Sequence, residues 1–424
     1  MGRWRYWIWS GLACCVLLLS SCQSSTSSQP DKVHLTLWQG ISPPANREVF
    51  QELVAKFNQT HPDIEVESLY VGQPDQQIPK ILTAIVGGAA PDILWYVPQL
   101  TGQLVELEAI QPLDDWLAQS PLRDQIDPAL FETMRLEGKL WSIPFATNNA
   151  ALFYRPSLFQ AAGISQLPQT WEELRQVARQ LTRDTNGDGR ADQHAMVLSL
   201  GKGEWAVFAW LPFVYSAGGW ISRADQPDLV NEGAIAALQL GQDLVQDGSA
   251  VLSAPERGYE TDSFIAGKVA MQVTGPWNLP QMQSAGIDFD VMPFPVETQP
   301  AAVVGGENFF LCRTTPAKTR AALTFFEYIL GDSFQQTWAL KTGYLPVNLK
   351  VRQSQDYQDF VAQNPALKVF LQQMEWAKSR PILAGYPYLS ENFGRAIEAS
   401  LLGTPPEEAL KTSQKRLALI FAER

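Results

Sequence analysis

Histidine and basic residues are both scarce in this sequence. Only His34, His61 and His194 occur in 424 residues, which disfavours a histidine-rich metal site and a Ser-His hydrolase. Lys and Arg number 32 against 44 Asp and Glu, and the formal net charge of -12 argues against a nucleic-acid backbone as the partner. The hydrolase motifs G-x-S-x-G and H-E-x-x-H are also missing.

Cysteine is equally rare, with 4 in the chain. Cys14 and Cys15 fall in an N-terminal segment that we expect to be removed, and Cys22 is expected to carry lipid. Cys312 is then the one thiol left in the mature chain, so an internal disulfide is not expected.

The N-terminus has the pattern of an export signal. Arg3 and Arg5 precede an apolar run from Trp7 to Leu19, which is shorter than the roughly 18–20 residues of a membrane-spanning helix. Leu19-Ser20-Ser21-Cys22 is typical of a bacterial lipobox. We expect residues 1–21 to be a lipoprotein signal peptide, Cys22 to be lipidated and residues 22–32 to form a flexible tether. The alternatives are an ordinary cleaved signal or an uncleaved anchor.

The mature chain alternates strand and helix patterns. Strands are predicted at 33–38, 64–71 and 90–95, with helices at 46–58 and 78–86 between them. The first helix is expected to bury Val49, Leu53, Val54 and Phe57. This alternation predicts an α/β fold with much parallel sheet.

Tryptophan is abundant, with 14 in the chain. Many must be core residues, but flat aromatic faces also stack on pyranose rings. Trp205, Phe208 and Trp210 cannot all share one helix face, so at least one is expected to point into a cleft. Trp277 follows a Gly-Pro turn and is either a stacking residue or a core residue held by that turn.

The stretch 141–174 marks a transition between two halves of the chain. Polar Thr147-Asn148-Asn149 interrupts apolar sequence just before an expected strand at 150–154. Further on, Thr170 and Glu173 have the spacing of a capping box at a helix start.

This stretch resembles the first interdomain crossover of the extracellular solute-binding proteins of ABC importers. That family includes the maltose-binding and glycerol-3-phosphate-binding proteins. The resemblance rests on Pro144, Tyr154, Ser157-Leu158-Phe159, Ala162-Gly163, Pro168, Thr170-Trp171 and Glu173-Leu174. Segments 264–278, 303–308 and 342–347 resemble later motifs of the family in the same order.

The resemblance implies a two-lobed α/β fold, the periplasmic-binding-protein type II fold, with the ligand cleft between the lobes. One lobe would comprise 33–145 plus 306–347, and the other 149–303 plus 352–424. A ligand that contacts both lobes favours their closed form, which would then dock on the ABC permease subunits. We expect a monomer in the cell envelope that contacts the membrane only through its lipid and needs no cofactor apart from the calcium considered below.

The candidate ligand contacts lie at expected strand ends and crossovers, which face the cleft. They are Trp38, Gln39, Asp92, Trp95, Asn148, Asn149, Trp205 or Trp210, Trp277, Asn278, Glu307, Asn308 and Tyr344. Two have structural alternatives: Asp92 as a carboxylate that caps the next turn, and Glu307 as part of a hinge salt bridge.

This set favours a neutral sugar or glycoside as the ligand. The rival ligand is glycerol 3-phosphate or one of its diesters, which needs cations or helix N-termini aimed at phosphate. Lys202 and Arg257 could supply such cations. A secreted glycoside hydrolase is the competing class, with Asp92 and Glu307 as its paired carboxylates.

The segment 184–192 reads D-T-N-G-D-G-R-A-D and matches most of a calcium loop. Position 12 is Ala195 instead of the bidentate Glu. Asp184, Asn186, Asp188 and Asp192 are therefore candidates for a weak structural Ca²⁺ site, and the alternative is a polar turn after the helix.

Overall fold

The computed structural model describes residues 32–422, except 202 and 255–258. The expected signal peptide, Cys22 and nearly all of the tether lie outside the described residues, as do Lys202 and Arg257. In the part of the chain that is described, no helix is both long and apolar enough to span a membrane.

The first lobe is built on a five-stranded sheet in the order β2-β1-β3-β15-β6. β1 pairs in parallel with β2 and β3, and the late strand β15 runs antiparallel to β3 and β6. The sheet therefore combines an N-terminal β-α-β-α-β series with a strand that returns from far along the chain. Its strands are β1 (Val33–Gln39), β2 (Ile64–Tyr70), β3 (Ile93–Tyr96), β6 (Ile143–Pro144) and β15 (Asn308–Leu311).

The second lobe repeats this arrangement in the order β11-β8-β12-β7-β13. β12 lies in the middle, parallel to β8 and antiparallel to β7. All six residues of β12 are buried, because the sheet is covered on both faces. The strands are β7 (Ala151–Tyr154), β8 (His194–Leu198), β11 (Ala250–Leu252), β12 (Val269–Thr274) and β13 (Asp290–Met292).

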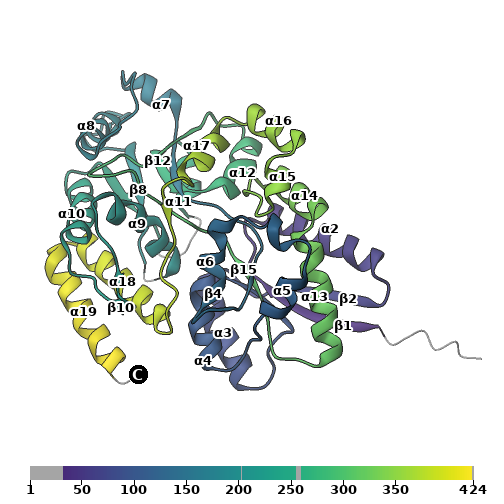
Figure 1. The fold of residues 1–424 in the computed structure, drawn as a ribbon. Coiled ribbons are helices and arrows are strands. Elements are labelled where there is room, and N and C mark those ends of the chain that lie inside the picture. Colours follow the sequence, from purple (N-terminus) through teal and green to yellow (C-terminus); the bar gives the residue numbers. More distant parts are fainter. Residues whose placement is uncertain (1–31, 202, 255–258, 423–424) are drawn as a thin grey trace, which may run out of the picture.

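Helices cover both sheets, and the elements of the second lobe lie apart from those around β1, β2 and α13 (Figure 1). Before the second sheet come α2 (Pro44–Thr60), α3 (Pro74–Val86), α4 (Thr101–Glu106), α5 (Asp114–Gln119) and α6 (Phe131–Met134). Between its strands β7 and β13, in chain order, come α7 (Pro156–Ala161), α8 (Trp171–Leu181), α9 (Glu204–Ser216), α10 (Glu232–Gln246), α11 (Tyr259–Ile265) and α12 (Leu279–Ser284). After β15 follow α13 (Pro316–Leu330), α14 (Asp332–Thr342), α15 (Leu349–Arg352), α16 (Gln355–Gln363), α17 (Ala366–Gln373), α18 (Tyr386–Leu401) and α19 (Pro406–Ala422).

Short elements complete the described chain. They are the strands β4 (Arg135–Leu136), β5 (Lys139–Leu140), β9 (Ser222–Arg223), β10 (Gln226–Pro227), β14 (Ala302–Val303) and β16 (Ala377–Lys378), and the 3-10 helices η1 (Pro98–Leu100), η2 (Arg123–Gln125), η3 (Pro128–Leu130) and η4 (Pro276–Asn278).

Local sequence signals set most of these boundaries. The capping box on α8 is confirmed, since Thr170 Oγ1 accepts from the Glu173 backbone and the Glu173 carboxylate accepts from the Thr170 backbone. The expected face of α2 is partly wrong: Phe50 is fully buried, whereas Val49 is only half-buried. Its companions Leu53, Val54 and Phe57 are buried as predicted.

The chain passes between the lobes in three segments, 145–150, 304–307 and 343–348, which we call the crossing segments. Backbone bridges join Asn148 to Gly305 and Thr147 to Leu345, so the three segments lie side by side. After the third, Tyr357, Val361 and Phe370 pack against the second sheet in one cluster with Phe153 and Val291. The predicted lobe boundaries are compatible with this path and stay a prediction.

Candidate functional site

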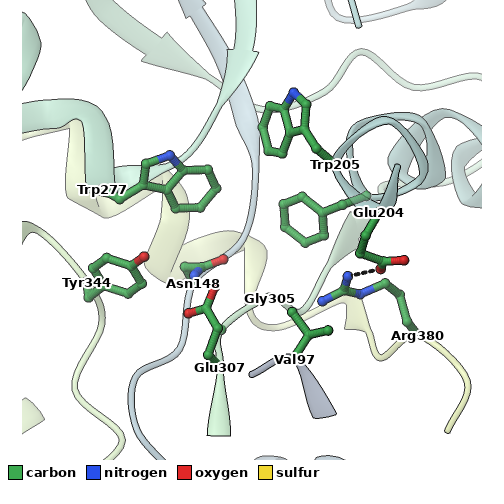
Figure 2. Close-up of a pocket in the computed structure, with 11 residues that line it drawn as sticks. Val97, Asn148, Glu204, Trp205, Trp277, Gly305, Glu307, Tyr344 and Arg380 are labelled. Carbon is green, nitrogen blue, oxygen red and sulfur yellow. Dashed lines mark hydrogen bonds and ion pairs between the residues drawn. The ribbon is translucent and has the colours of Figure 1, made fainter. Parts of the chain in front are cut away.

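A cavity lies where the crossing segments meet the start of α9. Its empty volume is ≈ 440 Å³, including the solvent at its mouth. We call it the central cavity (Figure 2). It is lined by Val97, Asn148, Glu204, Trp205, Phe208, Trp277, Gly305, Gly306, Glu307, Tyr344 and Arg380.

Each crossing segment contributes to the central cavity. Asn148 comes from the first, Glu307 from the second and Tyr344 from the third, and Figure 2 shows Asn148 and Glu307 next to each other. The close approach depends on glycine, because a Cβ at Gly305 would lie 2.1 Å from Oδ1 of Asn148. That Oδ1 is buried and has no hydrogen-bond partner among the described residues, so it is available to a ligand donor.

Four aromatic rings form one side of the central cavity. Trp277 lies 6.1 Å from Trp205, 6.4 Å from Phe208 and 6.2 Å from Tyr344, measured between ring centroids. Trp205 and Phe208 are three residues apart on α9 and therefore share a helix face. The Trp277 ring lies against Gly275, where a Cβ would be 2.0 Å from it, so glycine is required there.

A buried ion pair closes the other side. Arg380 is 4% exposed and its guanidinium pairs with the carboxylate of Glu204, the first residue of α9. Tyr386 also donates to Glu204, at 2.8 Å, and Arg380 lies 4.9 Å from the Phe208 centroid. Burial alone would lower the pKa of Arg380, but Glu204, Tyr386 and Glu307 together outweigh it, and the pKa lies above its ordinary value.

A second cavity adjoins the first, with an empty volume of ≈ 660 Å³ that again includes open solvent. Trp205 and Trp277 line both cavities. The indole N–H of Trp205 donates to Oε1 of Glu260 at 3.0 Å, and this bond fixes the Trp205 ring between the two cavities. The second cavity is lined by Ser42, Pro43, Pro44, Gln73, Trp205, Glu260, Thr261, Gln272, Val273, Thr274, Trp277, Asn278 and Gln281.

The family of the chain follows from a match of its sequence to a family model. Residues 52–369 match the model of the family described as bacterial extracellular solute-binding protein. The chain belongs to this family. Its fold is the two-lobed α/β fold expected from the sequence, and its relatives are binding proteins, so the chain is a solute-binding protein and not an enzyme.

Two curated relatives illustrate the range of this family. The maltotriose-binding protein of Pyrococcus abyssi is 23% identical over 74% of this solute-binding protein and 66% of its own length, just under two thirds. The sn-glycerol-3-phosphate-binding periplasmic protein UgpB of Yersinia pseudotuberculosis is 24% identical over 90% of this chain and 91% of its own.

Solved structures show the same fold. The GacH receptor of Streptomyces glaucescens superposes with a TM-score of 0.80 at 24% identity, covering 91% of this chain and 97% of that one. The maltotriose-bound MalE domain of Bdellovibrio bacteriovorus gives 0.79 at 25% identity, covering 92% and 100%. UgpB of Mycobacterium tuberculosis, in complex with glycerophosphocholine, gives 0.80 at 19% identity, covering 92% and 98%.

The structure brings together six of the predicted contacts. Asn148, Trp205, Trp277, Glu307 and Tyr344 line the central cavity, and Asn278 lines the second. Of the two tryptophans offered as alternatives on α9, it is therefore Trp205 that faces the cavity. Trp210 is 2% exposed and donates to the Ser199 carbonyl at 3.2 Å.

The other predicted contacts do not line either cavity. Trp38 packs on an apolar cluster of the first lobe, and Trp95 is 2% exposed in its core. Gln39 accepts from the Ile41 backbone, Asn149 donates to the Phe370 carbonyl, and Asn308 donates to the Thr133 carbonyl and Ser142. Gln39 is therefore bonded within its own loop, and Asn149 and Asn308 are bonded to segments distant in the sequence.

Asp92 has a structural environment. Its carboxylate accepts from the Thr36 backbone at 2.9 Å, from the Thr314 hydroxyl at 2.7 Å and from the Lys318 ammonium at 2.9 Å. It joins β1 to the start of α13 and does not meet Glu307 in the central cavity. The carboxylate pair that the glycoside hydrolase hypothesis needed is therefore not assembled there.

The sequence reasoning missed Val97, Glu204, Gly305, Gly306 and Arg380 as cavity residues, and it named Phe208 only as one of three aromatic residues of which at least one would face a cleft. Phe208 could have been found, since its spacing of three from Trp205 places both on one face of a helix. Arg380 carried no local signal: it follows β16 in an irregular segment and reaches the cavity only through tertiary packing.

The loop 184–192 forms a polar turn. The Asp184 carboxylate accepts from the backbone of Gly187, Asp188 and Gly189, while Thr185 donates to Asp192. The backbone bonds, that of Gly189 foremost, hold the pKa of Asp184 below its ordinary value. Across the described residues, no group of three or more His, Cys, Asp and Glu is arranged to hold a metal ion. The calcium site at Asp184, Asn186, Asp188 and Asp192 stays a prediction.

Proposed function

We propose that this protein is the lipid-anchored substrate-binding subunit of an ABC importer, and that it captures a sugar or glycoside in the central cavity. The observation that carries the proposal is the combination of aromatic rings and hydrogen-bonding groups in one enclosed space. Trp205 and Trp277 offer apolar ring faces, while Asn148 and Glu307 offer oxygen acceptors. Stacking faces together with a few acceptors are the chemistry that binds a pyranose.

Lobe closure is the expected means of capture. The central cavity takes Val97 from the first lobe, Trp277 from the second and Tyr344 from a crossing segment. A ligand that touches all of these binds the closed form more tightly than the open form, and so it shifts the population toward closure. The closed protein would then deliver the ligand to the permease.

Charge favours a neutral ligand. Among the described residues that line the two cavities, Arg380 is the only Lys or Arg, and its charge is paired with Glu204. Glu307 and Glu260 add further carboxyl groups. A phosphate ester placed there would meet more acidic than basic side chains, whereas a sugar hydroxyl can donate to carboxylates at no cost in charge repulsion.

A glycerophosphodiester is the second candidate, because Arg380 does line the central cavity. It would bind only if the phosphate displaced Glu204 from the guanidinium, or if Arg380 used another N–H. Two of the relatives above bind glycerol phosphates by name or by bound ligand, so this ligand belongs in the same screen.

The lipid anchor is the part of the proposal that rests on sequence alone, on Leu19-Ser20-Ser21-Cys22. Anchoring keeps the binding protein near the permease and raises its effective concentration there. The test is membrane fractionation of cells that express the chain with or without Cys22→Ala. Release of the variant into the soluble fraction supports the anchor, and equal membrane retention of both forms contradicts it.

A thermal-shift screen of the purified full chain in mild detergent tests the ligand. The panel holds mono- and disaccharides, glucosyl polyols and glycerol phosphates. A ligand that binds only the native state raises the melting temperature with its concentration. A shift with a neutral sugar that disappears in Trp277→Ala supports the proposal. A shift with phosphate esters alone would select the second candidate, and no shift together with glycoside turnover would overturn the binding role.

A further inference from the structure

Gln272 is an unusual residue in the second cavity. It lies on the central strand β12, paired with Phe153 of β7 and Val197 of β8. Its side chain is 0% exposed, yet neither its amide nitrogen nor its amide oxygen has a hydrogen-bond partner among the described residues. Both atoms belong to a residue that lines the second cavity.

An unpaired amide in this position opposes folding. Burying a polar group without a partner is costly, and an apolar side chain of similar size avoids that cost. Buried polar groups in native proteins are nearly always hydrogen-bonded, so an exception calls for an explanation. Because Gln272 faces a cavity, a bound molecule can supply both missing partners.

The surroundings of Gln272 define what that molecule is. Oε1 of Gln73, from the first lobe, is also buried without a partner among the described residues. Thr274, two residues along β12, shares the face of Gln272, and Asn278 donates to its hydroxyl at 2.9 Å. No Lys or Arg is among the described residues that line this cavity. The site thus offers neutral amide and hydroxyl groups from both lobes together with the carboxylate of Glu260, which suits hydroxyl groups and not a phosphate.

The two cavities adjoin at two shared tryptophans. Trp205 and Trp277 meet edge to face, with an interplanar angle of 80°, and each contributes to both linings. A ligand that stacks on these rings in the central cavity therefore lies next to the cavity that Gln272 lines.

We propose that the second cavity binds a second polyhydroxylated unit, recognised by the amide of Gln272 and by Gln73. The ligand is then a glycoside of at least two units, in which a sugar is linked to another sugar or to a polyol. This inference rests on the proposed function. It adds to that function the minimum length of the ligand and the residue that binds its second unit.

Isothermal titration calorimetry on the full chain tests it. The probes are glucose, maltose, sucrose and 2-O-glucosylglycerol, which separate a single ring from a second sugar and from a polyol arm. The variants are Gln272→Leu and Gln73→Leu. The control is Tyr357→Phe, which likewise removes a buried polar group without a partner among the described residues but lies outside both cavities.

The wild type is expected to bind one of the two-unit probes at least tenfold more tightly than glucose. Gln272→Leu should weaken that probe at least tenfold, change glucose affinity less than twofold, and melt at an equal or higher temperature without ligand. Gln73→Leu, at a half-buried position that tolerates substitution, should act in the same direction. Tyr357→Phe should leave every affinity unchanged.

Two results would overturn this inference and leave the proposed function standing. One is a glucose affinity equal to that of the best two-unit probe. The other is an equal loss of glucose and two-unit binding in Gln272→Leu. If no probe and no other saccharide or glycoside bound at all, the proposed function itself would fail, and the inference with it.

Discussion

The side-chain amide of Asn46 donates a hydrogen bond to the backbone carbonyl of Trp277 across 3.2 Å. This bond joins α2 of the first lobe to η4 of the second, and both residues are buried. At another contact between the lobes, Gly102 of α4 packs closely on Ala384. A Cβ on Gly102 would lie 2.6 Å from the Cα of Ala384. The lobes therefore touch at both places, and the first bond holds the backbone of Trp277, whose ring lines the candidate site.

Asn46→Ala is expected to weaken ligand binding by about two- to tenfold, because one buried hydrogen bond contributes roughly 0.5–1.5 kcal/mol. The loss should come mainly from faster dissociation, since the bond holds the lobes closed. Stopped-flow fluorescence measures the dissociation rate of the ligand. Asn58→Ala is the matched control: Asn58 bonds Val66 within one lobe, so it should lower stability and leave the dissociation rate unchanged.

Trp277→Ala is expected to reduce sugar affinity by about 30-fold or more, because central aromatic residues of a binding site often contribute over 2 kcal/mol. Titration calorimetry gives the affinity. Trp210→Phe serves for comparison, since Trp210 is buried in the core, donates to Ser199 and lines neither cavity. If Trp210→Phe lost as much affinity as Trp277→Ala, the assignment of the site to the central cavity would be wrong.

Arg380→Met should destabilise the protein by about 3–5 kcal/mol, because it leaves the Glu204 carboxylate buried without its cation. Arg380→Met combined with Glu204→Gln should cost clearly less than the sum of the two single changes. Urea unfolding of the four proteins gives this coupling. Additive losses would show that the pair contributes little to the folded state.

The carboxylate of Asp92 should make the free energy of unfolding depend on pH. Burial alone would raise the pKa of Asp92, but the hydrogen bonds from Thr36, Lys318 and Thr314 outweigh it and hold that pKa below its ordinary value. A carboxyl whose pKa is lower in the folded state stabilises fully above its unfolded pKa, about 3.9, and loses that contribution as pH falls through the folded pKa.

Asp92→Asn should therefore lower the free energy of unfolding at pH 7 by about 1.5–3 kcal/mol, the usual contribution of hydrogen bonds to a charged group. The difference from wild type should shrink as pH falls below about 4. Urea unfolding at pH 7 and at pH 3 measures it. A difference that stayed constant with pH would contradict the role given to this carboxylate.

Much of the fold could be predicted from the sequence because it depends on local patterns. Period-two and period-3.6 apolar spacing located β1, β2, α2 and α3, and the capping box fixed the start of α8. The turn before Trp277 and the polar Asn148 also placed two cavity residues correctly, since both lie where an apolar element ends. Signals of this kind are carried by neighbouring residues and need no knowledge of the rest of the molecule.

Only the tertiary structure decided which of the polar and aromatic side chains at strand ends face the cavity. Asp92, Asn149 and Asn308 occupy similar positions in the sequence pattern, but segments distant in the sequence cover them and take up their hydrogen bonds. Conversely, Arg380 enters the site by pairing with Glu204, 176 residues earlier. The physical reason is that access to a cleft depends on how distant segments pack, and no local periodicity records that packing.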